Sequence, residues 1–338
     1  MVTIADVAAH AGVGLGTVSR VLNGSPKVRE ETRARVLSAI EVLEYRPSPL
    51  AQGLSRGRCQ TLGVVVPFFT HASAVERLRG VVAGLDDSRY DLVLFNVESP
   101  VHRDEHLASL TGRDRADGLL VLSLPVPDRD LERLVAAGVP VVLVDALGRG
   151  VPTVVTDDLE GGRMATQHLV DRGHRSIGFI GAEPGNPFGF TSSARREAGY
   201  AEVLAEAGLP LRRELLRHGP HDREVARGLA AELLAEPDPP TAIFASSDVQ
   251  ATGVLAAAAE AGRRVPDDLS VIGFDDIELS SYVGLTTIRQ PLFESGLLGV
   301  QLLLESLAGE PAPPIDHELP LELVERTTTG PPPGRDDR

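Results

Sequence analysis

The sequence predicts a small all-α helix-turn-helix headpiece, followed by a larger α/β part built from two lobes, each a doubly wound parallel sheet. The first 24 residues contain two short helical patterns separated by a glycine. From Thr61 onward, short apolar runs alternate with helical patterns, which is typical of buried parallel strands covered on both faces. There are too many such strands for one compact sheet, so two lobes account for them better.

Composition limits the class of protein. The chain has 338 residues, enough for two or three domains with substantial cores, and its 42% hydrophobic content is ordinary for a globular protein. We see no early apolar run like a signal peptide and no stretch long enough to span a membrane, so we expect a cytoplasmic protein that does not contact membranes. The single cysteine, Cys59, excludes an internal disulfide and fits a reducing compartment.

Charge is divided unevenly along the chain. The net charge is −15, yet the first 60 residues carry eight Lys or Arg and five Asp or Glu, which leaves this segment at +3 and the remainder at −18. A basic head on an acidic body suits a protein that touches phosphate groups with one end only.

The first helical pattern begins after Thr3. Thr3 can cap a helix, and Asp6 stands three residues later in the capping-box position. Gly12 ends the pattern and permits a sharp turn. The apolar residues at helical spacing are Ile4, Val7 and Ala8.

The second pattern repeats that spacing with Val18, Val21 and Leu22, while Arg20 and Asn23 lie off the apolar stripe. Two short helices at an angle, the second with polar groups outward, form a helix-turn-helix that reads the major groove of DNA. On spacing alone, any small helical hairpin fits as well.

A third amphipathic helix is predicted over residues 30–43, and it completes a three-helix headpiece. Its expected inward-facing residues are Val36, Leu37, Ile40 and Leu43. A further helix of about two turns begins at Ser48, a capping residue, and Pro49, which suits the first helical position. Helices this short are marginal in water, and Gly53 weakens this one by roughly 1 kcal/mol, so it should form only when something holds it.

The remaining elements alternate. Strands are predicted at residues 62–66, 92–97, 118–124 and 139–144, and in a second series at 177–181, 242–246 and 270–274. Helices are predicted at 75–85, 102–110 and 129–136, and then at 161–170, 193–207, 223–234 and 249–261.

The segments "TIADVAAHAGV" and "TVSRVLNG" closely resemble the N-terminal signature of the lactose-repressor (LacI/GalR) family of bacterial transcription regulators, and the resemblance continues through the whole chain. It implies a two-lobed, periplasmic-binding-protein-like sensor whose chain crosses between lobes near residues 156–159, 287–289 and 317–319. A long helix over 293–307 then returns to the first lobe.

The domain boundaries follow from this resemblance. We expect a headpiece at 1–47, a hinge helix and linker at 48–60, a first lobe at 61–158 plus 289–317, and a second lobe at 159–288 plus 318–328. The proline-rich tail at 329–338 is expected to be disordered.

By resemblance, Leu15, Gly16 and Arg20 occupy the main base-reading positions. Arg20 can grip a guanine bidentately and Leu15 can touch a thymine methyl group. Leu54 matches the hinge leucine that enters the minor groove and kinks the duplex, although it could instead pack on the headpiece. The full set of expected DNA-binding residues is Thr3, Leu15, Gly16, Thr17, Ser19, Arg20, Asn23 and Leu54.

Candidate ligand residues follow predicted strands, because ligands of doubly wound sheets sit outside the carboxyl ends of the strands. Asp157, Asp248, Asp275 and Gln290 stand at such ends, although aspartates there can simply cap the next helix. The segments "RREAGY", "VIGFDD" and "TTIRQP" match family ligand positions at Arg196, Asp275 and Gln290. Carboxylates, an arginine and amides suit a polyol, because each engages adjacent hydroxyls bidentately.

One departure concerns the aromatic wall of the ligand site. Family members carry an "NPFF"-like stretch after the first strand, where this chain reads His71-Ala72-Ser73-Ala74 preceded by Phe68-Phe69-Thr70. The wall is therefore shifted or missing, and Phe274 or Phe190 would supply the stacking surface.

The resemblance implies a homodimeric repressor of a near-palindromic double-stranded operator, switched by a small polar effector, a sugar or sugar derivative. The alternative is a sugar-binding receptor without a DNA role. We expect no enzyme activity, metal or cofactor, because the sequence has no phosphate-cradling glycine loop, no metal-spaced His/Cys cluster and no nucleophile elbow.

Overall fold

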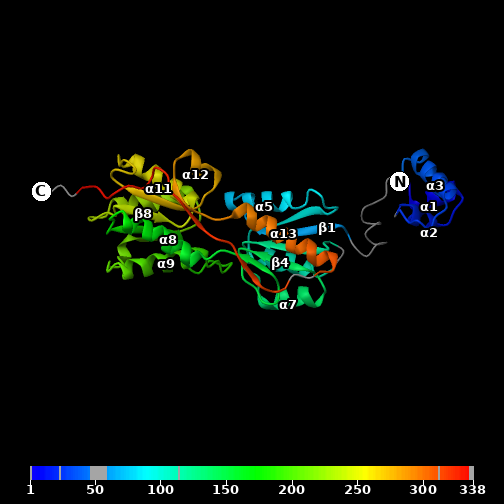
Figure 1. Ribbon diagram of the computed structural model, residues 1–338, viewed down its shortest axis with the longest axis horizontal. Helices are drawn as coiled ribbons and strands as arrows, with labels where there is room; N and C mark the ends of the chain where they lie inside the picture. Colours follow the sequence, from blue (N-terminus) through cyan, green and yellow to red (C-terminus); the bar gives the residue numbers. More distant parts are fainter. Residues whose placement is uncertain (1, 23, 46–58, 113–114, 311–312, 335–338) are drawn as a thin grey trace. The chain divides into compact units, whose positions relative to one another are not determined.

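The computed structural model describes residues 2–22, 24–45, 59–112, 115–310 and 313–334 (Figure 1). The chain divides into two compact units, residues 1–60 and residues 61–338, here called the head and the body. Among the described residues no helix is both long enough and apolar enough to cross a membrane.

The head holds three helices: α1 (Ile4–Ala11), α2 (Leu15–Leu22) and α3 (Glu30–Val42). The predicted capping box is present, because the Asp6 backbone N–H donates to Thr3 Oγ1 and the Thr3 backbone N–H donates to Asp6 Oδ2 at 2.8 Å. Gly12 ends α1 in the left-handed region, with φ of 64°. The core of the head consists of Val7, Ala8, Ala11, Val18, Val21, Val36 and Ala39.

One expected core residue of the head is on the surface. Leu37 is 51% exposed, and Ala39 is buried instead. The prediction was wrong because Val36 and Ala39, three residues apart, already fill the face of α3 that meets α1 and α2. Leu37 is rotated about 100° from Val36 around the helix and points away.

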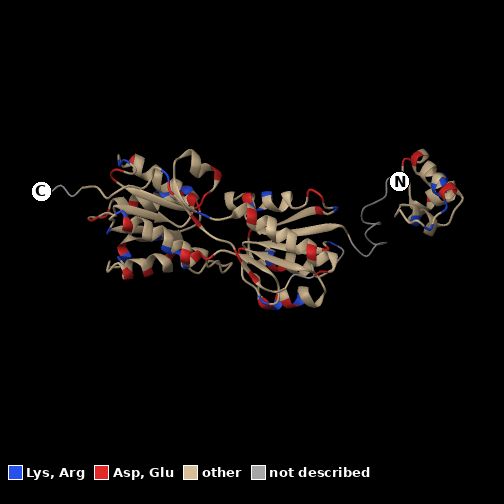
Figure 2. Ribbon diagram, in the orientation of Figure 1, with Lys and Arg blue, Asp and Glu red and all other residues tan. Residues whose placement is uncertain are grey.

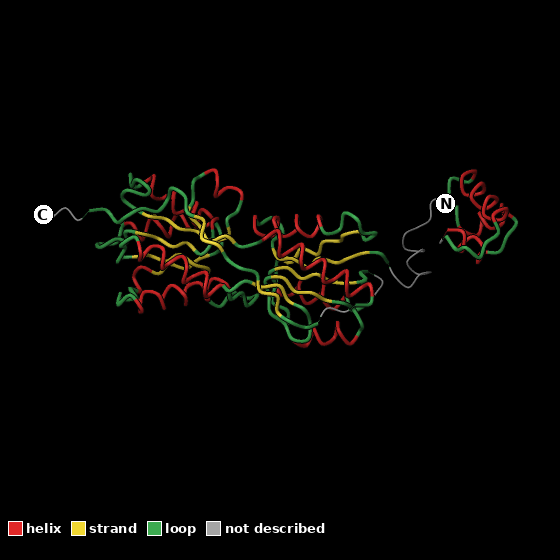
Figure 3. The backbone as a smooth tube through the Cα atoms, in the orientation of Figure 1, coloured by secondary structure: helices red, strands yellow, loops and turns green. Residues whose placement is uncertain are grey.

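The first lobe is a sheet in the order β11-β5-β4-β3-β1-β2, with all neighbouring strands parallel. Its strands are β1 (Thr61–Pro67), β2 (Asp91–Val97), β3 (Gly118–Leu122), β4 (Val141–Val144), β5 (Thr153–Val155) and β11 (Asp316–Glu318). Helices α5 (Ala72–Ala83) and α13 (Leu292–Ala308) pack on one face, and α6 (Pro100–Ser109) and α7 (Asp128–Ala136) on the other. The sheet thus lies between two helical layers (Figure 3).

The second lobe repeats the plan in the order β12-β10-β9-β8-β6-β7. Its strands are β6 (Ile177–Ala182), β7 (Leu216–Gly219), β8 (Ala242–Ala245), β9 (Ser270–Asp275), β10 (Thr286–Arg289) and β12 (Glu322–Val324), of which β12 is antiparallel to β10. Helices α8 (Asp158–Asp171) and α9 (Ser192–Glu206) cover one face. Helices α10 (Arg223–Leu234) and α11 (Asp248–Glu260) cover the other, and the 3₁₀ turn η1 (Arg213–Leu215) and the short α12 (Glu278–Tyr282) complete the lobe.

Three crossovers join the lobes, at residues 156–157, 290–291 and 319–321. Three residues lie across the boundaries that we expected from the sequence. Asp158 begins α8 of the second lobe, Arg289 pairs in β10 of the second sheet, and Glu318 pairs with Val155 in the first sheet. Each boundary moves by one residue, because strand pairing places Arg289 and Glu318 and the start of α8 places Asp158.

The C-terminal segment is anchored farther than the sequence suggested. Thr328 and Thr329 are buried, and Thr328 Oγ1 donates to the backbone oxygen of Val271 at 2.7 Å. The backbone oxygen of Gly330 accepts from His174 Nε2 at 3.0 Å. The expectation of a disordered tail from residue 329 is therefore wrong for Thr329 and Gly330, because β9 and β10 offer unpaired polar groups that these residues satisfy.

Acidic and basic residues are interspersed over both lobes (Figure 2). Many of them pair, as Arg163 does with Glu202 and Glu206 at 2.8 and 2.9 Å between α8 and α9. Such exposed pairs contribute little individually, so the packing of the helices on the sheets carries most of the stability.

Candidate functional site

A cluster of polar side chains joins the two lobes. We call it the interlobe cluster and define it as Arg77, Asp145, Asp158, Arg196, Asp275 and Gln290. Asp145 and Gln290 directly follow strands β4 and β10, and Asp275 ends β9. Because the carboxyl ends of the strands meet at the junction of the lobes, these side chains come from distant parts of the sequence to one place.

Arg196, on α9, is the centre of the second-lobe side of the cluster. Its Nε and Nη2 lie 2.8 and 2.7 Å from Oδ1 of Asp158, and its Nη1 donates to the backbone oxygen of Ser246 at 2.6 Å. The guanidinium carbon also lies 3.6 Å from the centre of the Phe274 ring. This combination of a carboxylate, a carbonyl and an aromatic face holds the planar guanidinium in one orientation.

The pairing of Arg196 with Asp158 depends on a close approach of α8 and α9. A Cβ added at Gly162 would overlap the backbone of Arg196, and one added at Gly199 would overlap the backbone oxygen of Leu159. The two glycines therefore let the helices meet at backbone distance, which brings the first residue of α8 within reach of Arg196.

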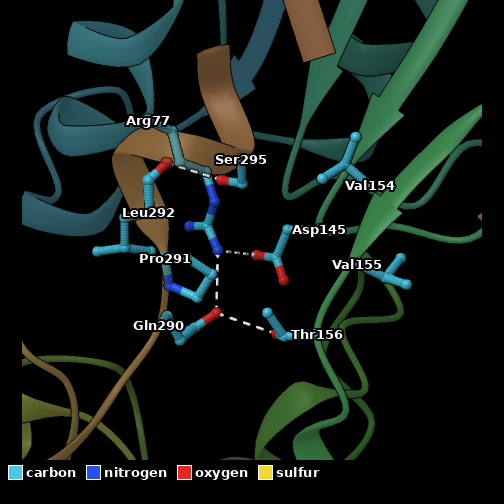
Figure 4. A pocket seen from close by; sticks show the side chains of 9 residues that line it. All are labelled: Arg77, Asp145, Val154, Val155, Thr156, Gln290, Pro291, Leu292 and Ser295. Atoms are coloured by element: carbon cyan, nitrogen blue, oxygen red, sulfur yellow. Dashed lines mark hydrogen bonds and ion pairs between the residues drawn. The ribbon is translucent and has the colours of Figure 1, made fainter. Parts of the chain in front are cut away.

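Gln290 connects the remaining members. Its Nε2 donates to Asp275 Oδ1 at 2.6 Å, and its Oε1 accepts from Arg77 Nη2 at 3.2 Å and from Thr156 Oγ1 at 3.3 Å. Arg77 Nη2 also lies 2.9 Å from Asp145 Oδ2. These contacts surround a small pocket at the first and second crossovers (Figure 4), lined by Arg77, Asp145, Val154, Val155, Thr156, Gln290, Pro291, Leu292 and Ser295.

Burial changes the acidity of the carboxyl groups. It raises the pKa of Asp158 despite the attraction of Arg196, and Asp145 raises it further. Burial also raises the pKa of Asp275 to about 6, against the opposing effect of Arg196 and the hydrogen bond from Gln290. Three carboxyl groups share two guanidinium groups here, so the cluster is an acceptor-rich site of low solvent exposure.

The other two predicted aspartates lie differently. Asp157 caps α8, accepting from the N–H groups of Leu159 and Glu160, and pairs with the half-exposed Arg195 at 3.0 Å. Asp248 is fully buried and accepts from the Ile277 N–H and the hydroxyls of Ser280 and Thr287 at 3.1, 2.6 and 2.6 Å. Burial, and then the charge of Asp275, raises the pKa of Asp248 to about 7.

An aromatic cluster closes the junction on the side of the loops after β1, β6 and β7. Phe68 stacks on His71 with ring centres 5.2 Å apart, and it meets Phe188 edge-on at 5.7 Å. Phe188 stacks on Phe190 at 5.1 Å, and His71 of the first lobe faces His221 of the second at 5.2 Å. Aromatic side chains from both lobes thus meet near the place where we expected a shifted or missing wall.

Phe274, which we considered as the stacking surface, is not part of this aromatic cluster. It is fully buried, and Arg196 covers one face of its ring. Phe190, the other residue considered from the sequence, is only partly buried and belongs to the aromatic cluster.

Sequence reasoning missed Arg77, Asp145 and Asp158. Asp145 directly follows a buried strand, so the strand-end rule would have found it in the first series of strands as well. Asp158 neighbours the chosen Asp157, and only the helix start decides which of the two points to Arg196. Arg77 stands on the inner face of an amphipathic helix, where a charged residue is itself the signal.

In the head, the outer face of α2 carries the expected DNA-reading residues. Leu15, Gly16 and Arg20 are exposed, and Thr17 and Ser19 are half-buried. Thr3 is exposed and its hydroxyl bonds to Asp6. Asn23 and Leu54, and with Leu54 the predicted hinge helix, lie outside the described residues.

No group of three or more metal-ligating side chains is found in the described part of the chain. The arrangement is that of a two-lobed receptor, with polar groups of both lobes at the junction, carrying a helix-turn-helix head.

The family model for bacterial regulatory proteins of the lacI family matches residues 3–48, and the model for the periplasmic binding protein-like domain matches residues 166–329. Catabolite control protein A of Priestia megaterium is 34% identical over 332 residues, which cover 97% of this chain and 99% of that protein. The transcriptional repressor PurR of Yersinia pestis is 34% identical over the whole of both chains.

Solved structures agree. The lac repressor dimer bound to operator and the anti-inducer ONPF has a TM-score of 0.82 at 29% identity and covers 97% of this chain and 99% of its own. The regulator CelR in complex with cellobiose has a TM-score of 0.70 at 33% identity, and the match covers 97% of this chain and 100% of that chain. The chain belongs to the LacI family and is a DNA-binding transcription regulator with an effector-binding domain.

Proposed function

We propose that this chain is a homodimeric repressor that binds a near-palindromic operator and is switched by an uncharged sugar or sugar derivative held at the interlobe cluster. The observation that carries this proposal is the position of the cluster. Its hydrogen-bonding groups come from both lobes and from a crossover, so a ligand bound there touches both lobes at once. A DNA-binding role also implies a cytoplasmic location.

The chemistry of the cluster favours a ligand with several hydroxyl groups. The carboxylates offer acceptor oxygens, while the guanidinium of Arg196 and the amide of Gln290 offer fixed donors, and each can engage two adjacent hydroxyls. The aromatic cluster supplies the flat apolar surface on which a sugar ring can stack. Related regulators have been crystallised with cellobiose and with ribose, which supports a carbohydrate.

The second proposed contact is with DNA. Leu15, Gly16 and Arg20 face solvent on α2, the position of the recognition helix in a helix-turn-helix. Arg20 would read a guanine in the major groove, and Leu54 would enter the minor groove at the centre of the operator.

The proposed dimer contact lies on the first lobe. Val75 and Val82 of α5 are 42% and 53% exposed, and Val93 and Leu94 of the edge strand β2 are 41% and 36% exposed. Exposed apolar side chains on an unpaired sheet edge and its neighbouring helix are typical of a surface that a partner covers. A second copy on this face would bring two heads to two half-sites.

In this scheme the ligand acts by changing the angle between the lobes. Because the first lobe begins directly after the linker, a change in that angle would alter the spacing of the two linkers in the dimer. We expect the helix predicted after Ser48 to form only when something holds it. Its formation, and with it operator binding, would then depend on the angle between the lobes.

A melting-temperature screen against cellobiose, ribose, other sugars and nucleosides tests the proposal. A sugar present at 100 times its Kd should stabilise the protein by about 2.7 kcal/mol. Arg196→Lys should abolish the shift in melting temperature, because the lysine ammonium cannot reproduce the planar, oriented set of N–H donors of the guanidinium. Arg195→Lys is the matched control, since Arg195 is the neighbouring residue and its guanidinium pairs with Asp157 at the surface, outside the interlobe cluster.

If no sugar in the screen stabilises the wild-type protein, the carbohydrate part of the proposal is wrong. If Arg195→Lys and Arg196→Lys lose the shift equally, the ligand does not bind at the interlobe cluster.

A further inference from the structure

Arg77 is a buried charged residue that neither its position in the sequence nor the usual amphipathic pattern explains. It lies on α5 in the first lobe, and only 3% of its surface is exposed. The other buried residues of α5 are small or apolar: Ala74, Gly80 and Val81. A buried guanidinium costs free energy unless it is paired, so its contacts must account for it.

Those contacts lead out of the first lobe. Arg77 Nη2 lies 2.9 Å from Asp145, which follows β4, and donates at 3.2 Å to Gln290, the first residue of the second crossover. Arg77 therefore ties the helical layer of the first lobe to a segment that connects the lobes (Figure 4).

Gln290 extends this link in two directions. Its oxygen also accepts from Thr156, in the first crossover, and its amide nitrogen donates to Asp275, in the second lobe. The amide thus holds two crossovers and one ligand-site carboxylate together, and Arg77 anchors it to α5.

The backbone around Arg77 is tightly placed. An added Cβ at Gly296, near the start of α13, would overlap the backbone oxygen of Arg77. Because α13 begins directly after the second crossover, this crossover is attached to α5 in two ways. Gly296 packs on the backbone of Arg77, and Gln290 accepts a hydrogen bond from the side chain of Arg77. The buried Nε of Arg77 has no hydrogen-bond partner among the described residues, and an unsatisfied buried donor of this kind costs free energy.

We propose that Arg77 is a positioning residue that sets the angle between the lobes and the orientation of Asp275, by clamping Gln290 and Asp145 together. The inference rests on the proposed function only in that the lobe angle is the quantity that the effector would change. Without the contacts of Arg77 with Gln290 and Asp145, the crossovers still connect the two lobes, but their side-chain attachment to α5 is lost.

The test measures the distance between the lobes in the full-length protein, because this distance changes with the angle between them. Spin labels are placed at Ala136→Cys, at the end of α7 in the first lobe, and at Ala231→Cys, on α10 in the second lobe, in a Cys59→Ser background. Both alanines are exposed. The labelled protein is mixed with excess unlabelled protein, so that a dimer carries one labelled protomer. Double electron–electron resonance then gives the distribution of distances between its two lobes.

Arg77→Met, which keeps an unbranched apolar stem and removes the guanidinium, should broaden this distribution and displace its mean. Gln290→Leu should do the same, because it removes the bridge and leaves the Arg77–Asp145 pair. Arg77→Lys should give an intermediate distribution, since an ammonium can still pair with Asp145. The matched control is Arg79→Met, on the same helix, where the side chain is 63% exposed and pairs with Glu76. The distance distribution of Arg79→Met should superimpose on that of the wild type.

A lower melting temperature with an unchanged distribution in Arg77→Met would overturn the proposal, because a purely structural role predicts that result. If Arg77→Met does not fold, Gln290→Leu decides alone, and an unchanged distribution in that variant would overturn the proposal equally. The measurement uses neither sugar nor DNA, so its failure is distinct from a failure of the proposed function.

Discussion

Five residues at the ends of strands show where this protein departs from ordinary backbone geometry. They lie at the carboxyl ends of β1, β3, β4 and β9, and their φ values are 45° for Phe68, 47° for Ser123, 57° for Asp145, 120° for Asp275 and 57° for Asp276. Non-glycine residues seldom adopt positive φ, and those that do gather at binding sites. Three of the five belong to the interlobe or aromatic cluster, so most of the strained residues lie where the clustered side chains lie.

At the same scale, Arg20 should carry most of the direct base readout, because the neighbouring Leu15 and Gly16 offer no side-chain hydrogen bond. We expect Arg20→Ala to cost roughly 1–3 kcal/mol at one base position per half-site. Titration of the variant against operators selected from a random pool, and against their single-base variants, measures this. Unchanged discrimination at every position would contradict the assignment.

Asp248 should make stability depend on pH. Its folded pKa, about 7, lies above its unfolded value of 3.8. A raised carboxyl pKa contributes stability that is full below pH 3.8 and is lost as the pH rises through 7. Asp248→Asn cannot ionise, so its melting temperature should fall less than that of the wild type between pH 4 and pH 7.

Asp157→Asn serves as the control for that series, because Asp157 is a solvent-accessible helix cap. It should retain the wild-type slope of melting temperature against pH. A wild-type slope in Asp248→Asn would show that another group causes the pH dependence.

At the scale of elements, the crossing of α8 and α9 places Arg196. Gly199→Ala would push a methyl group into the backbone of α8, so we expect a loss of about 1–3 kcal/mol or more, together with a weaker response to sugar. Urea unfolding and the melting-temperature screen measure the two effects.

Gly228→Ala, on α10, is the matched control. No atom lies within 4 Å of an added Cβ there, so this helical substitution should stabilise the protein by about 0.4–1 kcal/mol. Equal losses in both variants would mean that the helix crossing is not the cause.

The elements themselves were largely predictable, because helix and strand patterns are local. The alternation of apolar runs and amphipathic segments placed both sheets and their covering helices, and the capping box at Thr3 and the turn at Gly12 appear as expected. The short elements β7, β11, β12, α12 and η1 were not predicted. They have three to five residues, too few for a periodic pattern, and β11 and β12 exist because a neighbouring strand pairs with them.

At the scale of the whole molecule, the exposed apolar face of α5 and β2 should hold the dimer together. We expect Val82→Glu to convert the dimer to monomers, because it buries an unpaired charge in the contact. Sedimentation velocity measures the change, and operator affinity should fall with it.

Val135→Glu provides the comparison, since Val135 is 48% exposed on α7, on the opposite helical layer of the same lobe. It should remain dimeric. A dimeric Val82→Glu would place the contact elsewhere on the molecule.

The sequence by itself determined the helix-turn-helix head, the two α/β lobes and the strand ends where the candidate ligand residues stand, because each rests on patterns within a few turns or one strand. Only the tertiary structure decided that Asp158 rather than Asp157 meets Arg196, that aromatic rings from both lobes meet beside His71, and that Arg77 reaches Gln290. Arg77 and Gln290 are 213 residues apart in the sequence. Contacts over such separations depend on how strands and helices pack in space, and no local pattern encodes them.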